Sequence, residues 1–187
     1  MIYYDEFIYP VSRITAGVVG EPGQRIFILQ ARLNGEVLSW VIQKDHALAL
    51  SRAIPRLLED IHSEFPELEE PLVAAEPNLA LSEPLQPRFR VGSIGLGYDR
   101  VHDLVVLTLQ DADADDMTVE IPEDEADSDT VQVFTTRGQA LLLSRRAEEV
   151  VAAGRLLCPN CGEPMENSGH FCLASLKLRR GGGDYLQ

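Results

Sequence analysis

Hydrophobic and polar residues follow two different periods along this chain, and each period occurs twice. Short apolar or alternating stretches lie at 26–29 and 36–43, and again at 104–109 and 130–136. Stretches of this length and pattern predict β-strands. The dipeptide at 34–35, Asn-Gly, favours a tight hairpin turn between the first two of them. Longer stretches follow in which apolar residues recur every three or four positions, the period of one helix face.

The two helical stretches also match each other in sequence. HALALSR at 46–52 and QALLLSR at 139–145 share five of seven residues. Each stretch predicts an amphipathic helix with one buried stripe, because residues three and four apart lie on the same side of a helix. The expected stripes are Ala47, Leu50, Ile54, Leu57 and Ile61 in the first helix, and Ala140, Leu143, Ala147 and Val150 or Val151 in the second.

The ends of these helices carry recognisable signals. Asp45 is the candidate N-cap of the first helix, and Thr136 with Gln139 three residues on has the spacing of a capping box. Pro55 lies inside the first helix, where a proline costs about 3 kcal/mol. We therefore expect a kink or a break at Pro55.

The stretches before the helices correspond as well. Gly17 and Gly20 match Gly92 and Gly95, which lie 75 positions further on, whereas the matched helices lie 93 positions apart. The additional residues fall in segment 111–129, which contains ten acidic residues and no basic one. The second half therefore resembles the first half with an acidic loop inserted into its hairpin.

The fold class that follows is α+β, built from a duplicated β-β-β-α unit that forms one pseudo-symmetric two-layer domain. In each unit the helix covers the apolar face of a small antiparallel sheet. Between the units lies a stretch rich in proline and glutamate, which is typical of an extended linker. The expected boundaries are a first unit at 1–65, the linker at 66–87, a second unit at 88–155 with its acidic insertion at 111–129, and a C-terminal segment at 156–187.

The net charge of −14 argues against binding to nucleic acids, which requires clustered lysines and arginines. It also disfavours docking on anionic membranes. No apolar run approaches the roughly 20 residues of a membrane span. The N-terminus lacks a basic region followed by an apolar stretch, so we expect a cytoplasmic protein with reduced thiols.

All three cysteines lie in one short segment, together with one of the four histidines. Cys158 and Cys161 form a CxxC pair, and His170 and Cys172 supply two further ligands. Four nitrogen and sulfur ligands suit a tetrahedral Zn²⁺ ion and leave no position open for a substrate, so the predicted zinc site is structural. A redox CxxC pair is the alternative, but it leaves His170 and Cys172 unexplained.

Three arginines are candidates for an anion site. Arg25 ends the glycine-rich stretch at 17–25, whose backbone amides could hold an anion. That stretch lacks the P-loop pattern, and a strand, a turn and a strand explain its glycines equally. Arg52 and Arg145 occupy matching helix positions and could clamp an anion if the fold brings them together. Pairing with nearby acidic side chains is the alternative for both.

Three stretches taken in order resemble a known bacterial family: GVVGEPGQRIFILQ, FRVGSIGL and CPNCGEPMENSGHFC. The chain is similar to proteins of domain of unknown function 3090 over nearly its whole length. That resemblance implies a soluble protein and no assigned activity. The segment after Cys172 departs from the family pattern, which leaves the role of the tail open.

These observations favour a non-enzymatic interaction or adaptor protein with a structural zinc site and an unidentified protein partner. The alternative is a small-molecule or phosphate-ester enzyme whose site lies between the two halves and uses Arg52, Arg145 and the glycine-rich loops, the first of which ends at Arg25. A concave polar pocket between the halves would favour the enzyme. A filled interface would favour the adaptor.

Overall fold

The protein was analysed as a computed structural model, which divides into two compact units, 1–153 and 154–187. The structure describes residues 6–8, 10–20, 24–74, 78–112, 130–153, 156–157, 160–161, 164–165 and 172. The elements of the first unit are β1 (Glu6–Ile8), β2 (Arg13–Val19), β3 (Ile26–Leu33), β4 (Glu36–Ile42), α1 (Lys44–Glu64), β5 (Pro87–Asp99), β6 (Leu104–Asp111), β7 (Thr130–Thr136) and α2 (Arg137–Ala152). The described part of the second unit contains β8 (Leu156–Leu157) and β9 (Pro164–Met165).

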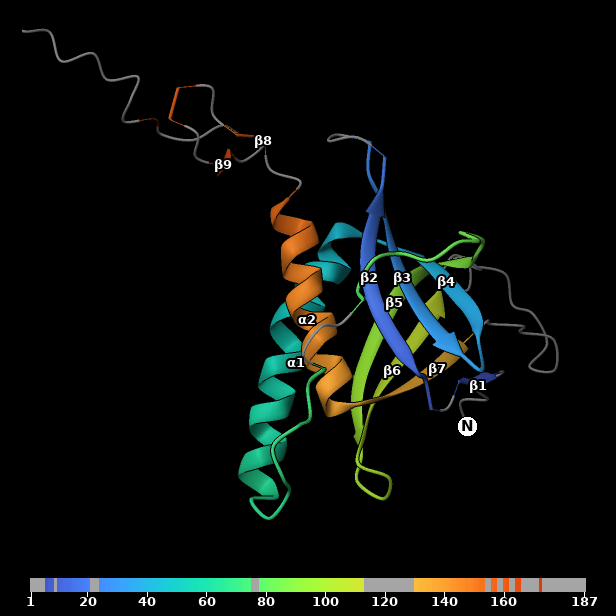
Figure 1. Ribbon diagram of the computed structural model, residues 1–187, viewed down its shortest axis with the longest axis vertical. Coiled ribbons are helices and arrows are strands. Elements are labelled where there is room, and N and C mark those ends of the chain that lie inside the picture. Colours follow the sequence, from blue (N-terminus) through green and yellow to red (C-terminus); the bar gives the residue numbers. More distant parts are fainter. Residues whose placement is uncertain are drawn as a thin grey trace, which may run out of the picture. The chain divides into compact units, whose positions relative to one another are not determined.

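The first unit contains one mixed sheet with the strand order β1-β7-β6-β5-β4-β3-β2. Strands β2, β3 and β4 form an antiparallel meander that leads into α1, and β5, β6 and β7 form a second meander that leads into α2 (Figure 1). The two meanders join where β4 and β5 pair in parallel. The α+β class is therefore confirmed, and each half has the expected order of three strands and a helix.

The ladders define which positions of the two meanders correspond. Ile42 and Thr135, each directly before a helix N-cap, pair with Phe27 and Val105. The rows beyond them correspond in turn: Gly17–Ile28–Val41 with Gly97–Val106–Phe134, Thr15–Gln30–Ser39 with Gly95–Thr108–Gln132, and Arg13–Arg32–Val37 with Ser93–Gln110–Thr130. Gly17 therefore corresponds to Gly97, and the predicted match to Gly92 is wrong. That match was based on the spacing of glycines in the sequence, which does not specify how strands pair.

The hairpin predicted at the Asn-Gly pair is present between β3 and β4. Asn34 and Gly35 have φ values of 50° and 87°, in the left-handed region that a type I′ turn requires at both of its central positions. The stretch that ends at Arg25 contains the end of β2 and leads into β3, which pairs with β2 in antiparallel orientation.

The sheet curves until its two ends meet. The Val11 amide donates to the carbonyl of Phe134 in β7 at 3.1 Å, and the next amide, Ser12, donates to Arg32 in β3 at 2.8 Å. Val11 and Ser12, which are adjacent in the chain, thus form hydrogen bonds with β7 and β3, which lie near opposite ends of the strand order. The Gln139 side chain of α2 donates to the Ser12 carbonyl at 2.9 Å, which ties the start of α2 to this crossing.

Both helices begin with a reciprocal capping box. In α2 the Thr136 hydroxyl accepts from the Gln139 amide at 3.2 Å and the Gln139 side chain accepts from the Thr136 amide at 3.1 Å, as predicted. In α1 the N-cap is Gln43, with His46 in the position of Gln139. The prediction of Asp45 as N-cap is wrong, because the helix begins one residue before it and Asp45 lies in the first turn.

The buried stripes of the helices agree with the sequence pattern. The α1 helix runs unbroken through Pro55, so the expected break is absent. Its buried stripe continues on both sides of the proline, at Ile54 and Ile61, and this burial opposes the cost of the missing hydrogen bond. In the part of the chain that the structure describes, no helix is long and apolar enough to cross a membrane. The buried stripe residues are Ala47, Leu50, Ile54 and Ile61 in α1, and Ala140, Leu143, Ala147, Val150 and Val151 in α2.

The core lies between the two helices and the sheet face that they cover. Alternate strand residues point to it, so Leu29 and Trp40 from the first meander join Leu107 and Val133 from the second. All four are fully buried. The residues between them point to the other face of the sheet, which is called the outer face below.

Candidate functional site

The outer face of the first meander is covered by a segment of the chain itself, residues 79–82 of the connection between α1 and β5. The Gln30 side chain forms two hydrogen bonds with the backbone of Ser82. Its Nε2 donates to the Ser82 carbonyl at 2.9 Å, and its Oε1 accepts from the Ser82 amide at 2.8 Å. Thr15 Oγ1 donates to the Leu79 carbonyl at 2.7 Å. These contacts explain why polar Thr15 and Gln30 are buried, at 0% and 3% exposed.

Two arginines and one glycine complete this contact. Arg13 donates to the Ser82 hydroxyl at 3.0 Å and also to the Ala80 carbonyl, and Arg32 donates to the same hydroxyl at 3.2 Å. The Leu81 side chain lies directly over Gly17, where a Cβ atom would come within 2.5 Å of Leu81 Cγ. The first meander thus binds the Leu-Ala-Leu-Ser segment through its backbone, one serine hydroxyl and one leucine.

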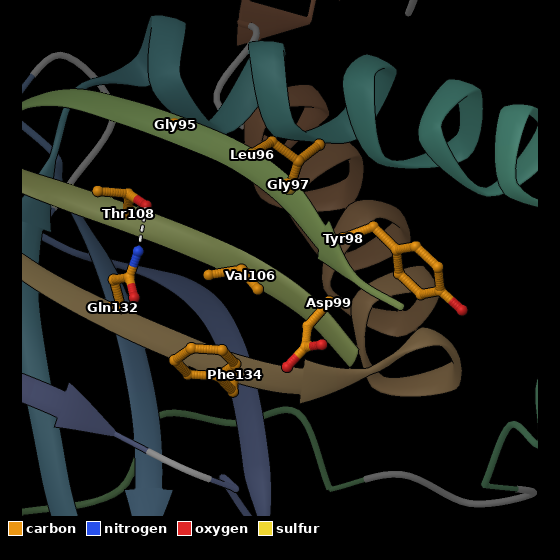
Figure 2. A pocket seen from close by; sticks show the side chains of 9 residues that line it. All are labelled: Gly95, Leu96, Gly97, Tyr98, Asp99, Val106, Thr108, Gln132 and Phe134. Carbon is orange, nitrogen blue, oxygen red and sulfur yellow. Dashed lines mark hydrogen bonds between the residues drawn. The ribbon is translucent and has the colours of Figure 1, made fainter. Parts of the chain in front are cut away.

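On the corresponding surface of the second meander, no described segment takes the place of residues 79–82. A shallow hollow of about 390 Å³ lies on the outer face of β5, β6 and β7, and we call it the groove (Figure 2). It is lined by Gly95, Leu96, Gly97, Tyr98, Asp99, Val106, Thr108, Gln132 and Phe134.

The groove has a polar pair and an apolar hollow at positions that correspond to the occupied surface. Gln132 Nε2 donates to Thr108 Oγ1 at 3.5 Å across β6 and β7, as Gln30 Nε2 donates to Ser39 Oγ at 3.2 Å across β3 and β4. Among the described residues, no atom lies within 4 Å of where a Cβ on Gly97 would be placed. The groove therefore has the glutamine–hydroxyl pair and the bare glycine of the first meander, and no segment within the described ranges covers it.

A second recess lies at the start of α2, between the connection after α1 and the turn between β5 and β6. Its volume is about 700 Å³, and Glu67, Glu69, Glu70, Asp103 and Arg137 are among its lining residues. Arg137 forms a bidentate pair with Asp103, at 2.7 Å from Nε to Oδ1 and 3.1 Å from Nη2 to Oδ2. It also donates to the Glu69 carbonyl at 2.8 Å.

The electrostatics of this recess follow from the same pair. Burial and the hydrogen bond that its hydroxyl donates to Asp103 raise the pKa of Tyr98 to about 12. Desolvation opposes ionisation of Asp103, but hydrogen bonds from Arg137 and Tyr98 lower the pKa of that carboxyl overall. The arginine is thus committed to a carboxylate inside the protein and is poorly placed to bind an external anion.

A smaller recess of about 310 Å³ lies at the edge of the packing between α1 and α2. Its charged or ionisable lining residues are Glu59, His62, Glu70 and Arg137. Since Arg137 is paired with Asp103, the remaining formal charges are the two glutamates. The recess therefore has an acidic character, which repels phosphate groups.

Comparison with protein-family models places residues 7–172 in the protein family of unknown function DUF3090. The chain belongs to this family. Neither a curated protein nor a solved structure gave a match. The resemblance inferred from the glycine-rich and cysteine-containing stretches is confirmed, and the family has no assigned activity that could be transferred to the fold or to the groove.

The predicted zinc ligands lie only partly within the described residues. Cys161 is exposed and Cys172 is half-buried, whereas Cys158 and His170 lie outside the described residues. Among the described residues, which contain two of the four predicted ligands, no three metal-ligating side chains form a cluster. The short strands β8 and β9 pair as an antiparallel hairpin whose connection, 158–163, contains the CxxC pair.

The three predicted anion-binding arginines lie on different elements. Arg25 is half-buried directly before β3, and its Nε and Nη1 atoms are shielded from solvent without a hydrogen-bond partner among the described residues. Arg52 and Arg145 are exposed on α1 and α2 at corresponding positions. None of the three lines any of the recesses described above. Their joint action on an anion stays a prediction.

Sequence reasoning missed the groove and the segment that fills its counterpart. The signal for the filled surface was faint: Thr15, Gln30 and Ser39 are polar residues at the centres of three strands. A polar row inside a sheet indicates a partner that satisfies its hydrogen bonds. The composition of the connection at 66–87 predicted an extended chain but gave no indication that residues 79–82 bind the sheet.

Proposed function

We propose that this protein is a non-enzymatic interaction protein, with a closed structural zinc site in its C-terminal unit and a protein partner bound by its main unit. The observation that carries the proposal is the filled interface between the two halves. The alternative enzyme would need its site there, but Leu50 and Ile54 of α1 and Leu143 and Ala147 of α2 belong to one continuous buried core.

The charges at the edge of that interface further support an interaction role over phosphate chemistry. Arg137 is held by Asp103, and Glu59 and Glu70 remain beside it. A phosphate-ester site instead requires uncompensated cations aimed at the substrate. The net charge of −14 adds to this repulsion of anionic substrates.

The zinc part of the proposal rests on the ligand spacing and on the β8–β9 hairpin. Leu157 pairs with Pro164, so the chain reverses direction across the connection that contains Cys158 and Cys161. Hairpins that present two cysteines from one turn are suited to hold one metal ion, and His170 and Cys172 would complete the ligand set. Metal binding would stabilise a segment too short to bury a core of its own.

We further propose that the two halves arose by internal duplication. Matching strand orders, matching ladder rows and a capping box at the same place in each half all favour a common origin. The acidic insertion at 111–129 then accounts for the difference in spacing between the halves.

The proposal is tested by zinc analysis, activity measurement and partner capture on the full-length protein. The wild type should bind about one equivalent of zinc, Cys161→Ser should lose it, and Ser168→Ala in the same segment should keep it. Protein purified under reducing conditions without zinc in any preparation would contradict the structural site.

The alternative function is tested with p-nitrophenyl phosphate and a panel of phosphate monoesters. We expect no turnover above the buffer rate. Turnover that Arg25→Ala or Arg52→Ala abolishes would overturn the non-enzymatic proposal. Affinity capture from the native cell should recover a partner in stoichiometric amount, and repeated recovery of the protein alone would count against an adaptor.

A further inference from the structure

We propose that the groove on β5, β6 and β7 binds an extended, uncharged segment of a partner protein, with a leucine side chain seated over Gly97 and the backbone held by Gln132. This inference rests on the proposed interaction function and names the chemistry that the partner must present. It is argued from the first meander, where the corresponding surface holds residues 79–82 of the chain.

The backbone-binding group is the first element of the comparison. In the occupied surface, Gln30 exchanges two hydrogen bonds with one residue, Ser82, as a neighbouring strand would. The cross-strand pair at that row is Gln30 with Ser39, and in the groove it is Thr108 with Gln132. The glutamine lies on a different strand, but the row again offers a carboxamide whose nitrogen donates and whose oxygen accepts.

The apolar hollow is the second element. Leu81 covers Gly17 so closely that a single added carbon would collide with three atoms of its side chain. Gly97 occupies the corresponding position, beside Val106 as Gly17 is beside Ile28, and the space above it is open among the described residues. A bare glycine next to apolar strand residues forms a seat for a branched apolar side chain (Figure 2).

The third element is the ladder row of Arg13 and Arg32, which indicates the charge of the ligand. In the first meander Arg13 and Arg32 bind the Ser82 hydroxyl and the Ala80 carbonyl. The corresponding residues of the second meander are Ser93 and Gln110, which hydrogen-bond to each other. The groove therefore lacks the cations of its counterpart in this row, so an acidic ligand gains nothing there and a neutral segment is favoured.

The test uses a synthetic peptide copied from the occupied surface, acetyl-Asn-Leu-Ala-Leu-Ser-amide, which reproduces residues 78–82. Isotope-labelled full-length protein is titrated with it to millimolar concentration and followed by amide NMR. We expect shifts concentrated on β5, β6 and β7, and a peptide with alanine in place of its second leucine should bind at least tenfold more weakly. Shifts confined to β2, β3 and β4, or none at all, would overturn the proposal.

The key variant is Gly97→Leu, which fills the hollow from within. Gly97 has no positive φ and no described neighbour at its Cβ position, so the substitution leaves the fold intact. It should reduce peptide affinity at least tenfold, whereas Ala53→Leu, which places a leucine at an exposed position of α1, should not. Equal affinity of the two variants would place the peptide elsewhere and reject the groove.

Other occupants give distinguishable results. If deletion of 114–128 shifts the groove amides without added peptide, the chain's own acidic segment is the occupant and the proposal is wrong. Concentration-dependent dimerisation that Gly97→Leu abolishes would identify a second copy instead and would equally overturn it. A stoichiometric partner captured equally by the wild type and Gly97→Leu would reject the groove and leave the interaction function standing. Loss of capture for every form would reject both.

Discussion

Adding one carbon at Gly17 should unseat the segment that covers the first meander. In Gly17→Ala the new Cβ would lie 2.5 Å from Leu81 Cγ and 2.8 Å from both of its methyl carbons. The whole isobutyl group must therefore move, and Leu81 is half-buried. Full burial of a leucine is worth about 1.5–3 kcal/mol, so loss of this contact should cost about 1–1.5 kcal/mol.

Displacement of Leu81 also strains the adjacent contact of Ser82 with Gln30. Each of those hydrogen bonds contributes about 1 kcal/mol, while replacing a strand glycine with alanine returns about 0.5–1 kcal/mol by restricting the unfolded chain. The expected net loss is about 1–2 kcal/mol. Gly97→Ala is the matched control: it has the same gain and no collision, so it should stabilise the protein by about 0.5 kcal/mol.

Urea unfolding followed by far-ultraviolet circular dichroism measures both variants under the same conditions, with the m value as a check on two-state behaviour. The two free energies of unfolding should differ by about 2 kcal/mol. If Gly17→Ala is as stable as Gly97→Ala, the segment is not packed on the first meander as described, and the basis for interpreting the groove is lost.

Three further predictions concern the rest of the first unit. Burial and Asp103 raise the pKa of Tyr98 to about 12, so protonated Tyr98 stabilises the folded state fully below pH 10, the ordinary pKa of tyrosine. This stabilisation is lost as the pH rises toward 12. Tyr98→Phe should remove this part of the fall in the free energy of unfolding at alkaline pH. Gln139→Ala removes the capping box of α2 and the hydrogen bond to the Ser12 carbonyl, so thermal unfolding should show a loss of about 1–3 kcal/mol, and an unchanged melting temperature would contradict the closure described for the sheet. Replacing 114–128 with two glycines should leave the melting temperature nearly unchanged, since the segment is strongly acidic and poor in large apolar residues, and a large drop would show that it packs on the unit.

The elements of the fold could be predicted from sequence because each depends on local pattern. The helix stripe at Ala47, Leu50 and Ile54 is set by residues three and four apart, and the turn at Asn34-Gly35 is set by two residues that tolerate positive φ. The capping box of α2 was equally local. The N-cap of α1 was misplaced because glutamine is an unusual cap, and its identity depends on the reciprocal contact with His46.

The candidate site could not be predicted because it depends on contacts between distant parts of the chain. Gln30 and Ser82 are 52 positions apart, and only the ladder register shows that Gly97, and not Gly92, corresponds to Gly17. Arg52 and Arg145 were selected by matching helix positions, a criterion that does not report what lies between the helices, and Arg25 was selected from the glycine-rich stretch that it ends. The groove is a sheet surface that the described part of the chain leaves uncovered, and a sequence pattern does not indicate which surfaces a distant segment will cover.

The central claim is that the second meander binds a partner where the first meander binds its own chain. Photo-crosslinking in the native cell tests it most directly, with p-benzoylphenylalanine incorporated in place of Thr108 in the groove and, as the control, in place of the exposed Ala53 on α1. We expect a discrete adduct from position 108 alone, with the crosslink mapped by mass spectrometry to an uncharged, leucine-containing segment of a second protein. Identical adducts from both positions, or an adduct to the chain's own residues only, would contradict it.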